Sequence, residues 1–564
     1  MNILGISCHY HDAAACLIRD GRIVAAAQEE RFNRRKACAD FPILAINSCL
    51  QQAGLTTLDL DYVAFHEKPY LKLSRTILSH LRGYPFSYRN FRRSIPEWLS
   101  RRLTLPLDVA RDLSFTGPVV FVKHHLAHAA SAFLLSGFEE AAVITADGLG
   151  EWATTSYGIG RGRDIEILQE LHYPDSLGLV YSAVTSYLGF RANSDEGRVM
   201  ALSDFGEPSY LDRFRKIIAV KDDGSYRVAE PYFEFVRGRR MYSRKFVRMF
   251  GSPREPGEEI TDRHRDIAAS LQKHLEEILI RMARHVQAVT KMKRLCAAGG
   301  VFLNCVANSR ILEETPFEEI FIQPAAGDAG GALGAAAAIS HSFLQEPREE
   351  GMSHARFGPE FSPEVMRRSL VNRGIEFREL SGDELAGTVA GLIADNRIVG
   401  WFQGRMEFGP RALGARSILA NPCSARMKDT LNEQVKHRES FRPFGVSILL
   451  ERTAEFFDFS TASPFMLLVA TARSEVNDQI TSALHVDGTS RLQTLTREDN
   501  GLYYDVVREF DRRTGVPMII NTSFNDHGEP IVCSPADACS CYLNTGLDAL
   551  VMGNLLAEKD DASR

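Results

Sequence analysis

The sequence predicts a two-domain α/β protein whose N-terminal domain carries one folding pattern twice. Its 564 residues are too many for a single hydrophobic core. A pattern of strand, polar turn, strand, tight turn and strand starts at residue 2 and starts again at residue 142. A polar stretch with Pro and Gly at 344–362 then predicts a boundary between domains at 1–345 and 360–564.

The first copy of the pattern consists of short apolar runs separated by turn residues. Asp20 and Gly21 are typical of a hairpin turn between its second and third strands. A polar loop follows, and then an amphipathic helix that ends at Gly54. The predicted strands, loop and helix are 2–7, 13–18, 23–27, 29–36 and 43–54.

The second copy has strands at 142–146, 153–158 and 165–170, and a long amphipathic helix is predicted at 266–293. Duplicated halves of this kind cradle a nucleotide, and the pattern resembles the actin-like ATPase and sugar-kinase superfamily. Polar and glycine residues at the ends of strands let a nucleotide approach the backbone. The candidate nucleotide-binding residues are Asp12, Gly148, Gly150, Gly299, Gly300 and Asn304.

Four candidate metal ligands lie where predicted strands or helices begin or end. His124 and His128 follow an apolar run at 119–122, predicted to be a buried strand, and at i and i+4 of a helix they point to one side. Two such histidines alone are more often ordinary surface or core residues. Asp147 after a strand and Asp328 before an Ala-rich helix change this balance, because two imidazoles and two carboxylates suit iron, manganese or zinc.

Composition and charge are those of an ordinary globular protein. A net charge of −6 and a pI near 6.3 give no overall reason to expect nucleic acid or an anionic membrane as a partner. The ten cysteines include no CxxC pair, which indicates reduced thiols. The chain starts without a signal-peptide pattern, and no apolar run approaches the roughly 20 residues of a membrane span. We therefore expect a cytoplasmic protein.

Two charged insertions interrupt the N-terminal domain. The segment 68–111 holds ten Lys and Arg residues against two acids, with Tyr, Phe and Trp between them. This composition suits an anion or nucleic-acid surface, or else a solvated helical insertion. The second interpretation is favoured because the whole chain is acidic. The other insertion, at 205–265, is a place where an acceptor pocket can be built.

Four clusters in the C-terminal domain combine Arg, Lys, Asn or Ser with Gly or Pro turns. They lie at 404–416, 436–444, 490–494 and 521–530. Arg offers paired donors to phosphate and carbonyl oxygens. The alternative is that these are surface charges. Because each of the four clusters adjoins a rigid turn, we favour a site that binds a small anion and stabilises a leaving phosphate.

The motifs together resemble a known family, the O-carbamoyltransferases of the NodU nodulation and tobramycin- and cephamycin-tailoring type. The resemblance extends from Ile3 to about Met552. It rests on HDAAA at 11–15, EERFNRRK at 29–36, HHLAHAASAF at 124–133, DGLGE at 147–151, GRMEFGPRALGARSIL at 404–419, KHRESFRPF at 436–444 and NTSFNDHGEPIV at 521–532. It implies an N-terminal domain like the actin-like threonylcarbamoyl-tRNA enzyme and an α+β C-terminal domain of the YrdC type.

The resemblance implies a first step in the C-terminal domain, where carbamoyl phosphate and ATP give carbamoyl-adenylate. Arg411 and Lys436 match positions implied to be catalytic. The residues implied to bind carbamoyl phosphate and the adenylate are Arg405, Arg411, Lys436, Arg442, Arg491, Asn521 and Ser523.

The implied second step takes place in the N-terminal domain. A ferrous ion on the four candidate ligands would hold the nucleotide phosphate, with manganese or zinc as alternatives and Mg²⁺ left open as the companion of ATP. His11 matches the base that takes the proton of the acceptor hydroxyl. Lys36 matches a basic contact to substrate phosphate. The expected acceptor is a small molecule such as a sugar or natural product, without nucleic acid or membrane.

Two other functions remain as alternatives. A tRNA-modifying threonylcarbamoyl transferase would use the same histidines, but the fused C-terminal domain argues against it. A nucleotide-dependent regulator on an actin-like fold would be non-enzymatic. It would need the nucleotide cleft but not His11, the metal ligands or the Arg clusters.

Overall fold

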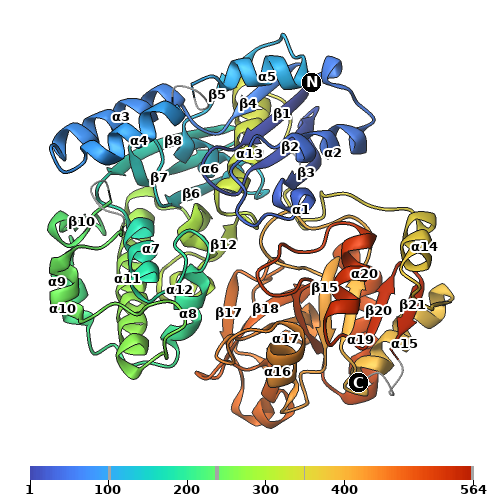
Figure 1. Ribbon diagram of the computed structural model, residues 1–564. Helices are drawn as coiled ribbons and strands as arrows, with labels where there is room; N and C mark the ends of the chain where they lie inside the picture. The colour runs from blue at the N-terminus through green and yellow to red at the C-terminus, as the bar shows by residue number, and fades with distance from the viewer. Residues whose placement is uncertain (99–102, 236–239, 349, 560–564) are drawn as a thin grey trace. The chain divides into compact units, whose positions relative to one another are not determined.

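The computed structural model describes residues 1–98, 103–235, 240–348 and 350–559 (Figure 1). The chain forms two compact units. The first comprises Met1–Glu29 and Ala37–Met352, and the second comprises Glu30–Lys36 and Ser353–Arg564. A short N-terminal segment thus belongs to the unit formed by the C-terminal part of the chain. The functions assigned above to the two predicted domains stay predictions.

The first sheet of the first unit has five strands in the order β3-β2-β1-β4-β5. Strands β1, β2 and β3 are antiparallel neighbours, whereas β4 and β5 continue the sheet in parallel with β1. The bounds are β1 (Asn2–Ser7), β2 (Ala14–Arg19), β3 (Arg22–Gln28), β4 (Tyr62–Phe65) and β5 (Val119–Phe121).

The second sheet of this unit repeats the arrangement in the order β8-β7-β6-β11-β12. Its first three strands are again antiparallel, and the two later strands are again parallel to the first. This duplication confirms the predicted actin-like α/β fold. The bounds are β6 (Glu140–Ala146), β7 (Ala153–Arg161), β8 (Asp164–His172), β11 (Arg294–Ala298) and β12 (Glu319–Ile322), with a separate hairpin of β9 (Ile218–Val220) and β10 (Tyr226–Val228).

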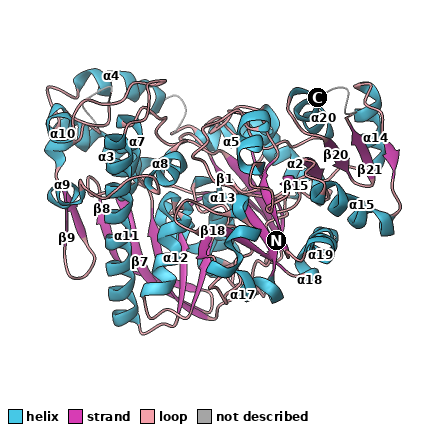
Figure 2. Ribbon diagram, turned by 90° about the horizontal axis from the view of Figure 1, so that it is seen from below, coloured by secondary structure: helices cyan, strands magenta, loops and turns pink. Residues whose placement is uncertain are grey.

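Helices pack on both sheets of the first unit, and the longest, α11, runs along β7 (Figure 2). It confirms the long amphipathic helix, with Ile267, Leu271 and Leu275 buried on one side. Parts of the two charged insertions, 99–102 and 236–239, lie outside the described residues. The bounds are α2 (Ile43–Ala53), α3 (Pro69–Arg82), α4 (Tyr88–Glu97), α5 (Leu105–Leu113), α6 (His124–Phe133), α7 (Leu177–Tyr187), α8 (Glu196–Ser203), α9 (Leu211–Ile217), α10 (Arg244–Phe250), α11 (Asp262–Thr290), α12 (Cys305–Glu314) and α13 (Asp328–Ala337).

Two local predictions are wrong. Strand β5 was expected to be buried, but its three residues are only partly buried because it forms the edge of its sheet. The stretch 29–36 was expected to be a polar loop. It contains one helical turn, α1 (Glu30–Asn33), in which Glu30 and Arg31 are buried. These charged residues are buried because they form an ion pair with each other, which a hydropathy pattern does not reveal.

The second unit is built on a nine-stranded mixed sheet in the order β13-β21-β20-β14-β15-β19-β16-β18-β17. Its strands are β13 (Arg378–Glu379), β14 (Val399–Phe402), β15 (Arg416–Ala420), β16 (Gly445–Leu449), β17 (Leu468–Thr471), β18 (Thr489–Leu495), β19 (Met518–Ser523), β20 (Ala549–Met552) and β21 (Leu555–Glu558). Its other helices are α14 (Pro363–Asn372), α15 (Gly382–Ala394), α16 (Met427–Thr430), α17 (Thr453–Phe456), α18 (Arg497–Asn500), α19 (Leu502–Thr514) and α20 (Pro535–Asn544). The likeness to the YrdC type stays a prediction.

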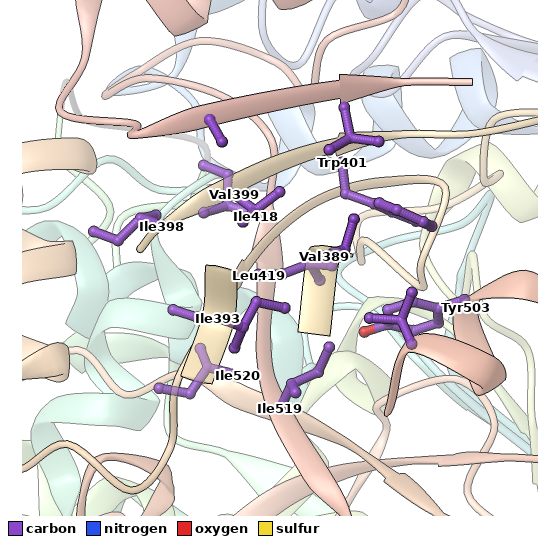
Figure 3. Close-up of a cluster of buried hydrophobic side chains, with 14 of the residues drawn as sticks. Val389, Ile393, Ile398, Val399, Trp401, Ile418, Leu419, Tyr503, Ile519 and Ile520 are labelled. Carbon is purple, nitrogen blue, oxygen red and sulfur yellow. The ribbon is translucent and has the colours of Figure 1, made fainter. Parts of the chain in front are cut away.

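The core of the second unit lies between this sheet and helices α15 and α19 (Figure 3). Val389 and Ile393 of α15 are fully buried against apolar residues of β14, β15 and β19. Trp401 is also buried, and its indole Nε1–H donates to the Gly414 carbonyl oxygen at 2.9 Å. The core therefore also anchors the loop before β15, which carries one of the predicted Arg clusters.

All ten cysteines lie in the described ranges, and none of them forms a disulfide bond. Within the same ranges, none of the helices combines the length and apolarity needed to cross a bilayer.

His485 is predicted to make the second unit sensitive to acid. Burial lowers the pKa of its imidazole to about 4 from the ordinary value near 6.5, and Arg491 acts in the same direction. The folded protein therefore binds this proton more weakly than the unfolded chain does. The contribution of neutral His485 to the free energy of unfolding is fully present above about pH 6.5 and is lost as the pH falls towards 4. The loss between pH 7 and pH 5 is about 1–2 kcal/mol. In urea unfolding at these two pH values, His485→Asn should lose less stability than the parent. Equal losses would rule out this origin.

Candidate metal centre and anion-binding site

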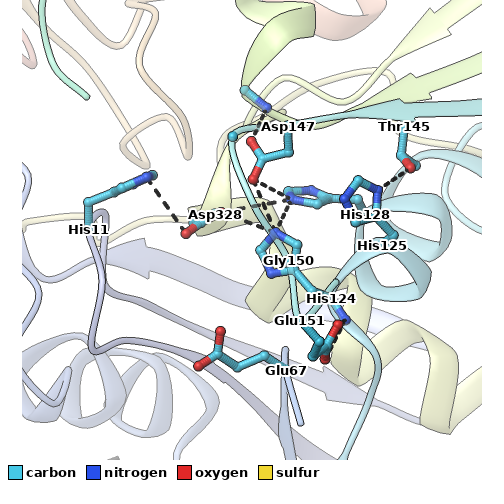
Figure 4. A network of polar contacts seen from close by, with 12 residues as sticks. His11, Glu67, His124, His125, His128, Thr145, Asp147, Gly150, Glu151 and Asp328 are labelled. Atoms are coloured by element: carbon cyan, nitrogen blue, oxygen red, sulfur yellow. Dashed lines mark hydrogen bonds and ion pairs between the residues drawn. The ribbon is translucent and has the colours of Figure 1, made fainter. Parts of the chain in front are cut away.

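Three elements of the first unit bring the four candidate metal ligands together (Figure 4). His124 and His128 lie one turn apart on α6. Asp147 follows the last residue of β6, and Asp328 is the first residue of α13. All four side chains are buried, Asp147 being the most accessible at 7%.

Helix α13 must approach its neighbours closely to place Asp328 beside the histidines. A Cβ atom on Gly334 of α13 would lie 1.8 Å from the carbonyl oxygen of Ala127 in α6. Likewise, a Cβ atom on Gly5 of β1 would lie 2.0 Å from the carbonyl oxygen of Ala332. Only glycine allows such backbone approach. The Ala- and Gly-rich sequence of α13 is thus a requirement of the site.

Gly334→Ala should therefore separate α13 from α6. We expect a loss of about 1–3 kcal/mol in unfolding free energy, the usual range for overpacking, together with weaker Mn²⁺ binding. Urea unfolding and a Mn²⁺ titration would measure both. Gly197→Ala on α8 is the matched control, because its Cβ would meet nothing within 4 Å. A Gly334→Ala protein as stable as this control would contradict the packing argument.

The donor atoms of the four residues converge on one point. The Nε2 atoms of His124 and His128 are 3.1 Å apart. Asp147 Oδ2 lies 3.1 Å from His124 Nε2 and 3.9 Å from His128 Nε2. Asp328 Oδ1 lies 3.6 Å and 3.8 Å from the same two nitrogens. All four donor atoms lie within 4.8 Å of one another.

The charge states of these residues fit a divalent cation. Burial lowers the pKa of both His124 and His128, so the imidazoles are neutral and keep a lone pair for a metal. Burial and the neighbouring Asp147 raise the pKa of Asp328 to about 7. Its Oδ1 accepts no hydrogen bond from any described residue. A cation would relieve the crowding of the two carboxylates, so the residues present suit a metal ion.

A surrounding set of hydrogen bonds orients the ligands. The Gly300 N–H donates to Asp147 Oδ1 at 2.8 Å. The Glu151 carboxylate accepts the backbone N–H of His124, and thereby caps the start of α6. It also accepts the backbone N–H of Lys68 at 2.7 Å, which ties the start of α3 to the centre. Sequence analysis missed the role of Glu151, although it ends the DGLGE motif.

A second group that offers metal-ligand atoms adjoins the first and consists of His66, Glu67 and His124. Here the ammonium group of Lys72 already forms a buried ion pair with Glu67. The Lys72 ammonium neutralises the Glu67 carboxylate. We therefore infer that this group holds α3 in place and does not bind a second metal ion. Sequence analysis also missed His66 and Glu67. The position of both directly after β4 was the available signal.

His11 lies at the edge of the metal centre in a strained turn. His9 and Asp12 both adopt positive φ angles, 73° and 52°, which is uncommon for residues other than glycine. This backbone directs His11 Nε2 towards Asp328 Oδ2 at 3.8 Å, while Nδ1 lies 2.9 Å from Asp12 Oδ2. Burial opposes a charge on His11, but Asp328, Asp12 and Asp147 raise its pKa to about 10. A bound cation would offset these carboxylates.

The predicted nucleotide-binding residues have different environments. Gly148 has open space around its Cβ direction, whereas Gly299, with φ at 100°, packs against the backbone of Ala146. Asn304 caps α12, and its amide exchanges hydrogen bonds with Gln272. Asn304 therefore has a structural role. A nucleotide contact by any of the six residues stays a prediction.

Lys436 is the centre of the basic cluster in the second unit. Its buried ammonium donates to the Ser523 carbonyl oxygen at 2.7 Å and to Asn525 Oδ1 at 2.6 Å. Burial lowers the pKa of Lys436 well below its usual range, and the charges of Arg442 and Lys36 act in the same direction. Arg442 and Lys36, both predicted residues, and their neighbour Arg438 therefore lie close enough to influence Lys436, and an anion bound there would restore its charge.

Asn521 and Arg491 lie in one row across three strands. Gly445 of β16 pairs with both of them, so the two side chains share a face of the sheet. A Cβ atom on Gly445 would lie 3.0 Å from Met466 Sδ and 3.2 Å from Arg491 Nε, so these side chains lie over the glycine. Among the described residues, neither Asn521 Oδ1 nor Arg491 Nε has a hydrogen-bond partner. The Asn521 amide donates to Ser447 and Gln493, which fixes its orientation. The face above Gly445 thus presents one acceptor and one donor.

Arg405 and Arg411 lie on the loop before β15, and the structure separates their roles. Arg405 donates to the carbonyl oxygens of Phe357 and Gly358, which ties down the loop. Arg411 is partly exposed. The buried Glu407 Oε1 accepts backbone N–H groups of Leu413, Ala415 and Arg416, at 2.7, 2.7 and 3.1 Å. These contacts hold the loop that carries Arg411.

Sequence analysis also missed two buried arginines that support this loop. The fully buried Arg416 donates to the carbonyl oxygens of Gln403 and Gly404. Arg31 of the EERFNRRK motif donates to the Gly409 carbonyl oxygen at 2.8 Å. A spacing of 378 residues separates Arg31 from Gly409, so no local pattern could reveal this contact.

Comparison with known proteins now identifies the family. Residues 2–337 match the model described as carbamoyltransferase N-terminus, and residues 390–559 match carbamoyltransferase C-terminus. This chain belongs to the carbamoyltransferase family. It is 39% identical to nodulation protein NolNO of Sinorhizobium fredii, over 98% of this chain and 80% of that protein.

Another relative is nodulation protein U of Rhizobium tropici, which is 31% identical over 96% of this chain and 93% of that protein. The crystal structure of T. kodakarensis HypF has a TM-score of 0.32 at 15% identity, covering 61% of this chain and 48% of that one. That likeness is too weak to bear on function. The family match establishes the chain as a carbamoyltransferase enzyme, as the motifs predicted.

Proposed function

We propose that this carbamoyltransferase forms carbamoyl-adenylate in its second unit and carbamoylates a hydroxyl group of a small molecule in its first. Carbamoyl phosphate gives up inorganic phosphate to water, and an oxygen of the resulting carbamate attacks the α-phosphorus of ATP as pyrophosphate leaves. The acceptor oxygen then attacks the carbamoyl carbon, AMP leaves, and the hydroxyl proton goes to a base.

The basic cluster around Lys436 supports the first step. Carbamoyl phosphate and ATP are both anions, and a buried ammonium next to Arg442 suits them. Asn521 Oδ1 and Arg491 Nε face the same side of the sheet, where a carbamoyl group, which is both donor and acceptor, can bind between them. Arg411, on the tightly held loop, would contact phosphate oxygens.

The single observation that carries the second step is the convergence of the His124, His128, Asp147 and Asp328 donor atoms beside His11. A divalent cation held there would neutralise phosphate charge as AMP leaves. Asp12 orients His11 so that Nε2 is the atom that takes the acceptor proton. The strained turn keeps the imidazole in this place before substrate binds. We propose iron as the metal, with manganese or zinc as alternatives.

The first test needs no acceptor. The purified full-length protein, supplied with Fe²⁺, is incubated with ATP, carbamoyl phosphate and labelled pyrophosphate. We expect label to enter ATP only when carbamoyl phosphate is present, because reversal of adenylate formation consumes pyrophosphate. Absence of exchange in a folded, metal-loaded protein would exclude the adenylate step.

Arg411→Met tests the assigned site within the same assay. We expect exchange to fall by about 10²-fold, the usual effect of losing one charged donor to a reacting oxyanion. Arg426→Met is the matched control, because Arg426 is an exposed arginine of the same unit outside the cluster. Equal activity of the two variants would remove Arg411 from the site.

A further inference from the structure

Helix α3 is oriented with its charged side inward. Lys72 and Arg75 are buried, and they lie on the same side of the helix. Lys72 forms the ion pair with Glu67, and Arg75 donates to the Gly150 carbonyl oxygen at 2.7 Å, next to the metal centre. These contacts prevent the helix from turning its other side towards the protein.

The side of α3 that faces away from Lys72, and that adjoins Arg75, exposes apolar residues to solvent. Leu71, Leu78 and Leu81 follow one another at helical spacing, and Leu81 is 64% exposed. A soluble helix normally shows the reverse arrangement, with leucines inside and charges outside. The buried polar contacts of Lys72 and Arg75 therefore keep these leucines in water, where their exposure is unfavourable.

The stripe continues into the turn between α3 and α4, which lie next to each other in the first unit (Figure 1). Tyr84, Phe86 and Tyr88 are exposed there, Phe86 by 73%. Arginines of the same two helices are exposed as well. We call the following set the α3–α4 surface: Leu71, Leu78, Leu81, Arg82, Tyr84, Phe86, Tyr88, Arg89, Arg92 and Arg93.

We propose that the α3–α4 surface binds the surface of an anionic lipid bilayer. Aliphatic, aromatic and cationic side chains are the three classes that an interfacial helix uses, for the acyl boundary, the headgroup level and lipid phosphate respectively. Four exposed arginines give this surface a positive charge although the whole chain is acidic, and a positive charge suits such a partner. The proposal concerns contact with one face of a bilayer and does not depend on the adenylate mechanism.

Two other partners fit this surface less well. A nucleic acid would suit the arginines and aromatic rings, but the exposed leucines gain nothing from stacked bases or phosphate. A second copy of the chain in a two-fold dimer would bring the same patch against itself, so the arginines would face arginines. The sequence predicted no membrane partner because the net charge of the whole chain is −6, and the sequence does not show which side of α3 is buried.

The test is sedimentation of the full-length protein with vesicles. Vesicles of phosphatidylcholine with about one third phosphatidylglycerol are compared with pure phosphatidylcholine at physiological salt. We expect at least tenfold stronger binding to the anionic vesicles, and release at high salt. Failure to sediment with anionic vesicles would overturn the proposal.

Variants separate the surface from general stickiness. Leu78→Glu with Leu81→Glu, and separately Arg92→Glu with Arg93→Glu, should each weaken vesicle binding at least tenfold while pyrophosphate exchange stays unchanged. Leu58→Glu is the matched control, because Leu58 is 84% exposed and lies outside the surface. Vesicle binding that survives in both double variants would contradict the proposal. Two further results would also contradict it. One is a concentration-dependent dimer that the leucine changes abolish while vesicle binding persists. The other is an RNA oligonucleotide that binds more tightly than the vesicles and is released by the leucine changes.

Discussion

Asp328→Asn is expected to weaken Mn²⁺ binding by about 10²-fold or more while carbamoyl-phosphate-dependent pyrophosphate exchange continues. Substitutions around a metal centre that leave the ligands in place already cost about 10–100-fold in affinity, so loss of a ligand charge should cost at least as much. The Asn amide has the size of the carboxylate, so little else in the packing changes. It also brings an N–H donor towards the two neutral imidazoles, where a metal needs an electron pair.

The measurement is a Mn²⁺ titration of the full-length protein followed by electron paramagnetic resonance, with the exchange assay on the same sample. Asp175→Asn is the matched control, because Asp175 is a half-buried carboxylate of the same unit that accepts the Val228 N–H. If Asp328→Asn bound Mn²⁺ as tightly as this control, the four-ligand centre would be wrong. If it lost exchange as well, the assignment of the two steps to separate units would fail.

Lys436→Met is expected to lower pyrophosphate exchange by about 10²–10³-fold, the range observed when one donor to a developing anion is removed. Methionine keeps the length of the side chain but removes the buried charge. The effect should be large because this ammonium is fully enclosed by Ser523 and Asn525, where an anion would feel it with little screening by water. Metal binding by the first unit should not change.

The control for this variant is Lys559→Met. Lys559 is a half-buried lysine of the same unit that donates to the Thr545 carbonyl oxygen and is not one of the predicted anion-binding residues. Thermal unfolding of both variants separates a loss of catalysis from a loss of fold. Lys436→Arg keeps the positive charge but cannot make the same contacts as a single ammonium group. We therefore expect its pyrophosphate exchange to lie between that of Lys436→Met and that of the parent protein. Full exchange in a stable Lys436→Met protein would exclude Lys436 from the reaction.

The sequence allowed the duplicated fold to be predicted because its evidence is local. Alternating apolar runs and hairpin turns predicted the antiparallel strands of both copies, and glycine marked the end of α2 at Gly54. The four metal ligands could be proposed for the same reason. Three of them stand at the end of a recognisable strand or at the start of a helix, and His128 lies one turn after His124 on the same helix. Such ends meet at one edge of a sheet in α/β folds.

The supporting residues could not be predicted in this way. Glu407 and Arg416 hold the Arg411 loop through backbone groups, and a contact with a peptide group leaves no sequence pattern. Arg31 is part of a recognised motif, but its polar neighbours in the sequence predicted a polar loop. Its true environment depends on a carbonyl group hundreds of residues away. Helix α3 is a similar case, because its amphipathic pattern does not say which side faces inward.

By itself, therefore, the sequence determined the order of the elements, the family and the candidate ligands, since these depend on neighbouring residues and on residue type. Only the tertiary structure decided that Gly334 lets α13 reach α6, that Glu30–Lys36 joins the second unit, and that Lys72 and Arg75 turn the leucines of α3 outward. These features depend on distances between segments far apart in the chain. Close packing and the pairing of buried charges set such distances, and neither is written in any one stretch of sequence.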